Sequence, residues 1–242
     1  MMNGLTILTC TYRYDARMEM LRRASTIFSR IDLPINWVVI EDSAHPDPAV
    51  FGLLAGNGKL NTKHLWYGPT KAWGNAQKNV ALQWIRENVH DGVVYIADDD
   101  NAWSDALFYE MMNLEPMTVG VMPVGRQNPG QPLGVERPIC YDGKIWGWDS
   151  NFSSRVFSCD MAGFCFDVRL LDNMDGNPWK ATRRGGESIF LKELYAGRTK
   201  YEMQPLCDDC NWVGVWHDQP LEVGNPDCIF EPVQLPRFKI FY

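Results

Sequence analysis

The most constraining feature of this chain is a short apolar segment that ends in three consecutive aspartates. Val93 to Ala97 is apolar and rich in β-branched side chains, and Asp98 to Asp100 follows directly. Such a run predicts a strand buried on both faces of a helix-covered sheet. Three adjacent carboxylates repel one another at the edge of a core, and a divalent cation would offset that cost. The segment therefore predicts a Mg²⁺ or Mn²⁺ site with coordination left for a phosphate. The alternative is a solvated acidic turn that caps a helix starting near Ser104.

Strand-like and helix-like segments alternate up to this point. Strands are expected at Leu5 to Thr9, Trp37 to Ile40 and His64 to Tyr67, and helices at Leu21 to Ile31, Val50 to Leu54 and Ala76 to Val89. Each strand has polar residues at its carboxyl end. This alternation predicts a doubly wound α/β fold with a parallel sheet, in which ligands sit beyond the carboxyl ends of the strands. Neither G-x-G-x-x-G nor G-x-x-x-x-G-K occurs, so a nucleotide would have to be held by side chains and a metal.

The second half of the chain has a different composition, rich in proline, glycine and aromatic residues. Strands are expected at Val119 to Val124 and Val213 to Trp216, a hairpin with an Asp-Gly turn at Tyr141 to Trp146, and a helix at Glu187 to Leu194. A continuous sheet is expected to join the two halves, so we predict one domain over residues 1–242, with its halves at 1–124 and 125–242.

Composition excludes several classes of partner. The net charge of −7 argues against nucleic acid or an acidic membrane surface, and no apolar run is long enough to span a bilayer. The strand expected from Leu5 leaves no room for a signal peptide, so we expect a soluble, cytoplasmic protein unless an N-terminal anchor has been removed. The seven cysteines are scattered and do not resemble a disulfide framework. Cys207 to Cys210 is a single CxxC motif without a second pair, so neither zinc binding nor a redox function is expected of it.

Seven short motifs recur, in this order, in one known family. They are Thr11-Tyr-Arg13, Trp37-Val-Val-Ile-Glu-Asp42, Gln77-Lys-Asn-Val-Ala-Leu82, Val94-Tyr-Ile-Ala-Asp-Asp-Asp-Asn101, Asp160-Met-Ala-Gly-Phe164, Gly186-Glu-Ser188 and Val215-Trp-His217. The chain from Leu5 to His217 thus resembles the β-1,3-glucuronosyltransferases of glycosyltransferase family 43. The resemblance implies a GT-A fold with a Rossmann-like nucleotide-binding half, and an acceptor-binding half after residue 124. It further implies a UDP-sugar donor, Mn²⁺ (Mg²⁺ being possible), and transfer to a glycan acceptor with inversion.

The resemblance also assigns roles on the donor side. Asp100 is expected to bind the metal directly, Asp99 to contact the ribose and Asp98 to support the site. Tyr12, beside Thr11, would stack on the uracil, and Asp42 would accept its ring N–H. Read without the resemblance, Tyr12 is an ordinary rim aromatic and Asp42 a turn residue or helix N-cap.

On the acceptor side, the resemblance makes Glu187 the general base that takes a proton from the attacking hydroxyl. The alternative is that Glu187 only favours the dipole in the first turn of its helix. Glu136 and Asp160 match carboxylates that bind hydroxyls of the acceptor sugar. Arg155 matches a position near the site, although it reads equally as a surface arginine.

Lys78 and His217 bear on the identity of the donor, because family members carry arginine and histidine there, facing the phosphates and the uronate. Lysine keeps the charge but loses the bidentate fork. Further departures are Cys10, Trp73, Asn151 and Gln219, which stand where proline, a basic residue, tryptophan and arginine are expected.

UDP-glucuronic acid is therefore the leading donor, with UDP-xylose or UDP-glucose as the alternative. A non-catalytic glycan-binding scaffold and a nucleotidyltransferase acting on sugar phosphates are the other hypotheses. A homodimer is possible, and an N-terminal anchor would imply the Golgi lumen.

Overall fold

The computed structural model describes residues 3–71, 74–126, 134–150, 155–180, 186–217 and 231–237. Trp73, Asn151 and Gln219, three of the expected departures from the family pattern, lie outside these ranges. Among the described residues, no helix combines the length and the apolar composition needed to cross a bilayer.

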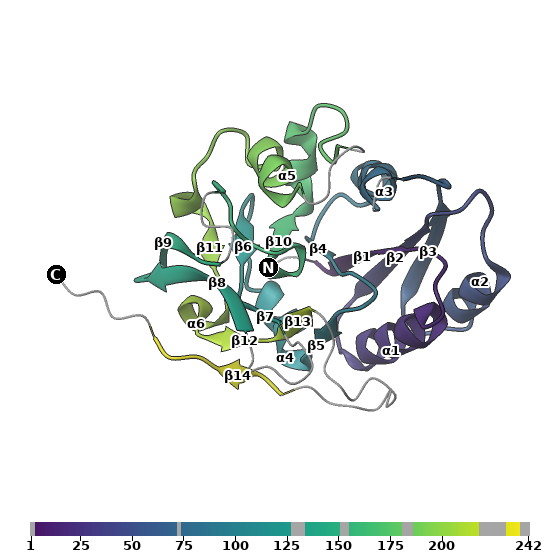
Figure 1. The fold of residues 1–242 in the computed structure, drawn as a ribbon, viewed down its shortest axis with the longest axis horizontal. Helices are drawn as coiled ribbons and strands as arrows, with labels where there is room; N and C mark the ends of the chain where they lie inside the picture. The colour runs from purple at the N-terminus through teal and green to yellow at the C-terminus, as the bar shows by residue number, and fades with distance from the viewer. Residues whose placement is uncertain are drawn as a thin grey trace.

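A seven-stranded sheet in the order β11-β6-β10-β4-β1-β2-β3 forms the centre of the fold (Figure 1). Its strands are β1 (Leu5–Thr11), β2 (Ile35–Glu41), β3 (Asn61–Trp66), β4 (Val93–Ile96), β6 (Val119–Val121), β10 (Phe164–Asp167) and β11 (Gln204–Pro205). The strands β3, β2, β1 and β4 run parallel, whereas β10 is antiparallel to both of its neighbours. The predicted α/β fold with a mostly parallel sheet is confirmed, and β4, the apolar run before the aspartates, is its middle strand.

Helices cover both faces of this sheet. They are α1 (Arg17–Arg30), α2 (Pro48–Ala55), α3 (Asn75–Asn88), α4 (Asp105–Met111), α5 (Glu187–Leu194) and the short α6 (Cys207–Cys210), with 3-10 turns η1 (Met161–Gly163), η2 (Val168–Asn173) and η3 (Lys200–Glu202). On β4, Val93 and Tyr95 pack in the core under α1, α2 and α4, whereas Val94 and Ile96 pack in the core under α3 and α5. Successive side chains of a strand point to opposite faces, so a run buried on both sides must be apolar throughout.

A second, five-stranded sheet in the order β5-β13-β7-β8-β9 packs beside the first. Its strands are β5 (Ala102–Trp103), β7 (Val124–Arg126), β8 (Gly134–Tyr141), β9 (Lys144–Asp149) and β13 (Val215–His217), and β12 (Trp212–Val213) pairs separately with β14 (Val233–Gln234). The predicted Asp-Gly hairpin joins β8 to β9. Asp142 and Gly143 have φ values of 52° and 68°, as a two-residue turn of type I′ requires.

Two strand predictions were wrong in the same way. The segment from Val119 to Val124 is two strands in different sheets, because the chain leaves the first sheet at Met122 and passes through Pro123, which has no N–H to donate. The strand expected from Val213 to Trp216 is likewise divided at Gly214, whose carbonyl accepts from the Ser104 N–H at 2.8 Å. An apolar run predicts burial but not the sheet to which each residue belongs.

Candidate active site

The carboxyl ends of β1, β2 and β4 meet at one edge of the parallel sheet and open into a cavity of about 490 Å³. Its walls include seven of the residues singled out from the sequence: Thr11, Tyr12, Asp42, Lys78, Asp98, Asp99 and Asp100. Cys10, Thr70, Lys71 and Gly74 complete the lining. The three strands are parallel neighbours, so residues that directly follow them must gather at the same place.

The three aspartates lie on a turn that is folded back on itself. The Asp98 N–H donates to the side-chain oxygen of Asn101 at 3.1 Å, and the Asn101 N–H donates to the Asp98 carbonyl at 3.2 Å. From beneath, the buried guanidinium of Arg23 donates to the Asn101 carbonyl at 2.6 Å. Strand β5 separates this turn from α4, whose N-cap is Ser104. The acidic turn therefore does not cap that helix.

Asp99 points inward rather than into solvent. Its side chain accepts from the Thr11 hydroxyl at 2.5 Å, and the residue is 8% exposed. The pKa of Asp99 is raised to about 7, mainly by burial and also by the charges of Asp100 and Asp98, while the Thr11 hydrogen bond opposes these effects. Tyr14, which the sequence reading passed over, also lies here, since Asp99 adds to the effect of burial in raising the pKa of its hydroxyl.

Asp98 and Asp100 form one group with His217. One potential ligand atom from each residue lies within 4.8 Å of the others, a spacing that fits around a single ion. His217 ends β13, and its Nδ1 lies 3.4 Å from the Asn101 side-chain nitrogen, so the acidic turn and the second sheet meet at this histidine. Within the described ranges, no other cluster of three or more His, Cys, Asp or Glu side chains is placed to hold a metal.

At the other end of the cavity, Tyr12 offers an exposed ring. Its side chain is 59% exposed and its ring centroid lies 5.0 Å from that of Tyr14. Asp42 is fixed nearby, because its carboxylate accepts from the Thr70 N–H at 2.7 Å and from the Thr70 hydroxyl at 3.3 Å. Gly68 allows this approach: a Cβ there would lie 2.1 Å from the Asp42 carboxylate, and its φ of +149° also disfavours other residues.

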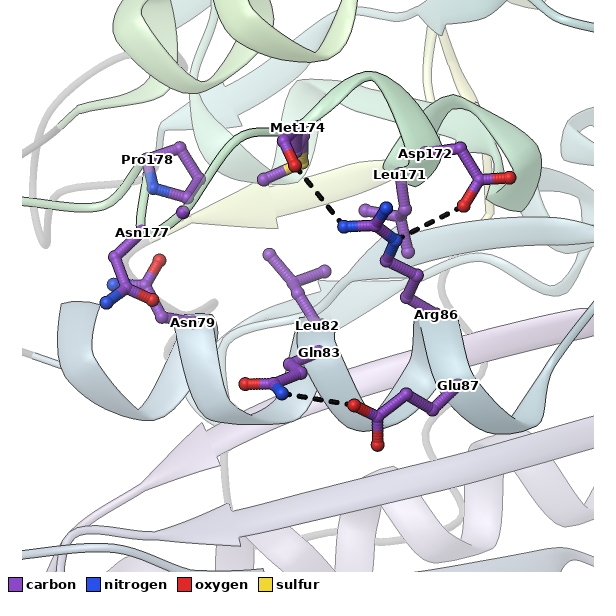
Figure 2. Close-up of a pocket in the computed structure, with 11 residues that line it drawn as sticks. Asn79, Leu82, Gln83, Arg86, Glu87, Leu171, Asp172, Met174, Asn177 and Pro178 are labelled. Carbon is purple, nitrogen blue, oxygen red and sulfur yellow. Dashed lines mark hydrogen bonds and ion pairs between the residues drawn. The ribbon is translucent and has the colours of Figure 1, made fainter.

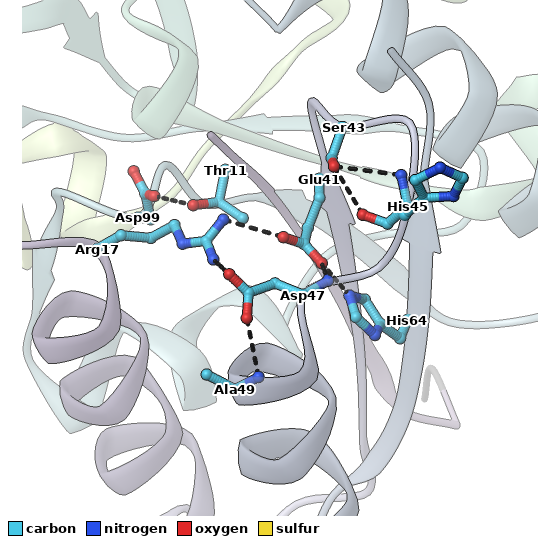
Figure 3. A network of polar contacts seen from close by, with 9 residues as sticks. All are labelled: Thr11, Arg17, Glu41, Ser43, His45, Asp47, Ala49, His64 and Asp99. Atoms are coloured by element: carbon cyan, nitrogen blue, oxygen red, sulfur yellow. Dashed lines mark hydrogen bonds and ion pairs between the residues drawn. The ribbon is translucent and has the colours of Figure 1, made fainter. Parts of the chain in front are cut away.

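A buried ionic network supports this wall from below (Figure 3). Glu41, the last residue of β2, accepts from Arg17 at 2.9 Å and from the Asp47 N–H at 2.8 Å, and it lies 2.6 Å from His64 Nε2. Burial alone would raise the pKa of Glu41, but the contacts with His64, the Asp47 N–H and Arg17 outweigh it and lower the pKa. Arg17 also binds the Asp47 carboxylate at 2.5 Å. The network ties α1, β3 and the start of α2 to the strand that carries Asp42.

Lys78 reaches the cavity from α3 and is almost fully buried. Its ammonium lies 4.6 Å from the ring centroid of Trp179 and 3.5 Å from the side-chain oxygen of Asn75. None of the ion pairs formed among the described residues includes Lys78. A buried ammonium held by a π-face and an amide is suited to an anionic ligand.

The predicted base lies on the far side of the acidic turn, at the first residue of α5. Glu187 accepts from the Gly186 N–H at 3.0 Å and from Arg155 at 3.4 Å, which brings together two residues predicted for this side of the site. Asp160 caps η1 by accepting from the Ala162 N–H at 3.0 Å. Burial raises the pKa of Asp160, His217 lowers it, and the charges of Asp98 and Glu187 raise it. Asp160 is therefore near both the metal-ligand group and the predicted base.

Glu136 enters the same region from β8. It is opposite Val124 of β7 and accepts from Arg126 at 2.7 Å. Arg126 in turn pairs with His217 in the strand register, so Glu136 and His217 lie on one face of the second sheet. No sequence signal pointed to Arg126, since its importance depends on the pairing of β7 with its neighbours.

A second cavity, of about 420 Å³, lies between α3 and η2 and contains none of the predicted site residues (Figure 2). Arg86 crosses it, donating to the Asp172 carboxylate at 3.2 Å and to the Met174 carbonyl at 3.3 Å. The lining of this second cavity shares no residue with the lining of the first.

Solved structures with the same fold place the chain in a structural class. The TarS protein of S. aureus, residues 1–349 in complex with UDP-GlcNAc, superposes with a TM-score of 0.65 at 15% identity, over 90% of this chain and 59% of that one. The inositol-1-phosphate CTP transferase of T. maritima superposes with a TM-score of 0.56 at 8% identity, over 84% and 85% of the two chains. The fold is that of the GT-A glycosyltransferases.

Sequence comparison then identifies the family. The model of glycosyltransferase family 43 matches residues 24–220. Galactosylgalactosylxylosylprotein 3-beta-glucuronosyltransferase 2 of Mus musculus is 32% identical over 237 residues, covering 90% of this chain and 69% of that protein. Galactosylgalactosylxylosylprotein 3-beta-glucuronosyltransferase 1 of Homo sapiens is 33% identical over 235 residues, covering 87% and 67%. The chain belongs to glycosyltransferase family 43 and is a glycosyltransferase, which confirms the resemblance read from the motifs.

Proposed function

We propose that this chain transfers a sugar from a UDP-sugar to a hydroxyl of a glycan acceptor, with inversion at the anomeric carbon. One observation carries the proposal. One cavity is lined by six of the seven predicted donor-binding residues and by Asp100, and Asp98 and Asp100 form a possible metal-ligand group with His217, the seventh. Asp160 is close enough to Asp98, His217 and Glu187 for their charges to shift its pKa. A donor and an acceptor bound on the two sides would meet at the acidic turn.

On the donor side, the exposed ring of Tyr12 would stack on the uracil, and Asp42, held by Thr70, would accept the ring N–H. Asp99 and Thr11 line the part of the cavity next to the acidic turn, where the ribose would lie. Lys78 would face the diphosphate, because its buried ammonium contacts a π-face and an amide and forms no ion pair within the described part of the chain.

Asp98, Asp100 and His217 would hold a divalent metal. Carboxylates suit Mn²⁺ and Mg²⁺, and an imidazole among the ligands favours Mn²⁺ of these two. The donor set and its spacing fit such an ion. When bound, the metal supplies positive charge that stabilises the diphosphate leaving group. Asp100, predicted to be the direct ligand, would thus share the ion with Asp98 of its own motif and with His217, which that motif does not reveal.

Glu187 is the proposed general base. The acceptor oxygen forms a bond to the anomeric carbon as the bond from that carbon to the phosphate oxygen breaks. UDP leaves with the bonding electron pair, and the hydroxyl proton passes to Glu187. Arg155 and the Gly186 N–H hold this carboxylate in place. Asp160 and Glu136 would orient the acceptor through its other hydroxyls, which raises the effective concentration of the attacking oxygen.

UDP-glucuronic acid is the leading donor, and a glycan ending in galactose the leading acceptor, because the relatives are named as glucuronosyltransferases acting on galactosylgalactosylxylosylprotein. Lys78 and His217 would place two cationic or hydrogen-bonding groups near a uronate. UDP-xylose and UDP-glucose are the alternatives, since a lysine lacks the bidentate geometry with which arginine recognises a carboxylate.

The test is thermal unfolding of the full chain with UDP and with UDP-glucuronic acid, UDP-xylose, UDP-glucose and CTP, each with and without Mn²⁺. A ligand at about 100 times its Kd adds roughly 2.7 kcal/mol of stability. We expect the uridine nucleotides to stabilise the chain only with Mn²⁺. The UDP-sugar that raises the thermal stability most then identifies the donor. If UDP with Mn²⁺ does not stabilise the chain, the proposal is wrong; if CTP stabilises it as strongly, the nucleotidyltransferase hypothesis gains.

A further inference from the structure

Two exposed aromatic rings lie on the second sheet, away from the cavity. Trp146, on β9, is 53% exposed, and Tyr201, on η3, is 54% exposed. Their ring centroids are 6.5 Å apart and their planes meet at 77°, so the two rings form a corner. Large aromatic side chains are costly to leave in water, and an exposed pair of them indicates a binding surface.

This corner is held in place by the protein itself. The Trp146 indole N–H donates to the Tyr141 carbonyl at 3.3 Å, across the Asp-Gly hairpin. Lys200 donates to the Trp146 carbonyl at 3.0 Å, and its ammonium lies 5.4 Å from the Tyr201 ring centroid. Because the rings are oriented before any ligand arrives, binding would cost little side-chain entropy.

The register of the second sheet connects the strand that carries Trp146 to the proposed reaction centre. Glu136 pairs with Val124, and Arg126, two residues further on, pairs with His217. Paired residues and residues two apart point to the same side of a sheet. Glu136 and His217 therefore share one face.

The same argument extends along β9. Pro138, two residues after Glu136, pairs with Trp148, and Trp146 lies two residues before Trp148. Trp148 therefore shares the face of Glu136. The pairing then skips Trp146, because Ile139 pairs with Gly147 and Cys140 with Ile145, so Trp146 is the extra, unpaired residue of a β-bulge next to Trp148. Four residues of strand separate Trp146 from the level of Glu136, or roughly 13 Å at about 3.3 Å per residue. Figure 1 shows β8 and β9 running outward together from the middle of the molecule.

A second path links β9 to the proposed base. The Trp148 indole N–H donates to the Val156 carbonyl at 3.2 Å, and the Val156 side chain is exposed. Its neighbour Arg155 binds Glu187 at 3.4 Å. The exposed surface thus continues from Glu187, over Val156 and Trp148, to Trp146.

We propose that Trp146 and Tyr201 form a remote glycan-binding subsite, which holds the third sugar of an oligosaccharide acceptor, counted from the reacting one. The inference rests on the proposed function, because it assigns the far end of the acceptor. Sugar rings have an apolar face that packs on an aromatic ring, and their hydroxyls stay in water beside Lys200. Two rings cover far less than the roughly 800 Å² that each partner buries in a stable protein interface, which favours a glycan over a second copy of the chain.

The experiment compares acceptors of increasing length with the full chain, Mn²⁺ and the donor found above. The probes are methyl β-galactoside, galactosyl-galactose and galactosyl-galactosyl-xylose linked to serine. For Trp146→Ala and Tyr201→Ala we expect KM for the longest probe to rise about tenfold, with KM for the donor and for the two shorter probes unchanged. Phe51→Ala, which removes an equally exposed ring on α2, should change none of these values.

Equal KM values for wild type and Trp146→Ala on the longest probe would overturn the inference while leaving the proposed function intact. Conversion of a wild-type dimer to a monomer by Trp146→Ala would overturn it too, because the rings would then lie between two copies of the chain. If the wild type transfers sugar to none of the three probes, the proposed function fails. Binding of the protein to an array of neutral and acidic oligosaccharides then tests the subsite alone. Glycans bound by wild type and lost from Trp146→Ala would uphold it, and no retention would overturn it.

Discussion

Replacing Lys78 by methionine tests whether the cavity is built for a diphosphate. The ammonium is buried, lies over Trp179 and within 3.5 Å of Asn75, and takes part in no ion pair among the described residues. Methionine is similar in length and lacks the charge. In the free protein the substitution removes the desolvation cost of a buried cation and loses a cation–π contact of about 2 kcal/mol. We therefore expect the free protein to be at least as stable as wild type.

The liganded protein should behave oppositely. A hydrogen bond to a charged group contributes about 1.5–3 kcal/mol, so the Kd for UDP should rise roughly 10- to 150-fold. With UDP at about 100 times the wild-type Kd, a 30-fold weaker variant would retain only about 0.9 of the 2.7 kcal/mol of stabilisation. For a domain of this size, about 3 °C accompanies each kcal/mol. The shift in Tm on adding UDP should therefore fall from about 8 °C to about 3 °C.

The assay is thermal unfolding with Mn²⁺, with and without UDP, supported by calorimetric titration of UDP. Arg86→Met is the matched control, because Arg86 lies on the same helix but faces the second cavity. An unchanged UDP shift in Lys78→Met would refute the assignment to the diphosphate. Loss of more than about 2 kcal/mol in the free protein would instead indicate that Lys78 serves the core.

Three further predictions concern the base, the metal and the supporting network. Glu187→Gln should lower kcat by roughly 10²- to 10⁴-fold with the UDP-induced Tm shift unchanged, and full turnover would remove Glu187 as the base. Asp100→Ala and His217→Ala should each weaken the Mn²⁺-dependent part of UDP binding by at least about tenfold, as measured by titration with Mn²⁺. Wild-type dependence of UDP binding on Mn²⁺ in His217→Ala would exclude His217 as a ligand. The pKa of Glu41 is lowered in the folded protein, so its stabilising contribution is present above its unfolded value of about 4.3 and is lost as pH falls below it. Glu41→Gln should therefore lose about 3 kcal/mol at pH 7 and show a flatter acid transition by circular dichroism, whereas parallel acid transitions would contradict this reasoning.

Local sequence predicted the elements of the nucleotide-binding half because each depends on nearby residues. The apolar run before Asp98 had to be a buried strand, since its side chains occupy both faces, and Gly143 after Asp142 allowed only a tight turn. The gathering of Thr11, Asp42 and Asp98 also followed from sequence, because parallel strands deliver their carboxyl ends to one edge. The family motifs added the roles of these residues, which residue spacing alone leaves open.

What the sequence could not supply was the pairing between distant segments. The division of Val119 to Val124 between two sheets depends on which strands lie beside it, and no local pattern records that choice. Cys210 illustrates the same limit: its sulfur lies 2.8 Å from that of Cys140, on β8, a partner that its own CxxC motif does not indicate.

The sequence by itself therefore determined the α/β alternation, the family and the identity of the polar residues at the strand ends, because these depend on periodicity and on short motifs. Only the tertiary structure decided that His217 joins Asp98 and Asp100, that Arg155 holds Glu187, and that Trp148 lies on the face of Glu136. The physical reason is that a site assembled from two sheets depends on strand order and register, which the chain acquires only when those sheets pack together.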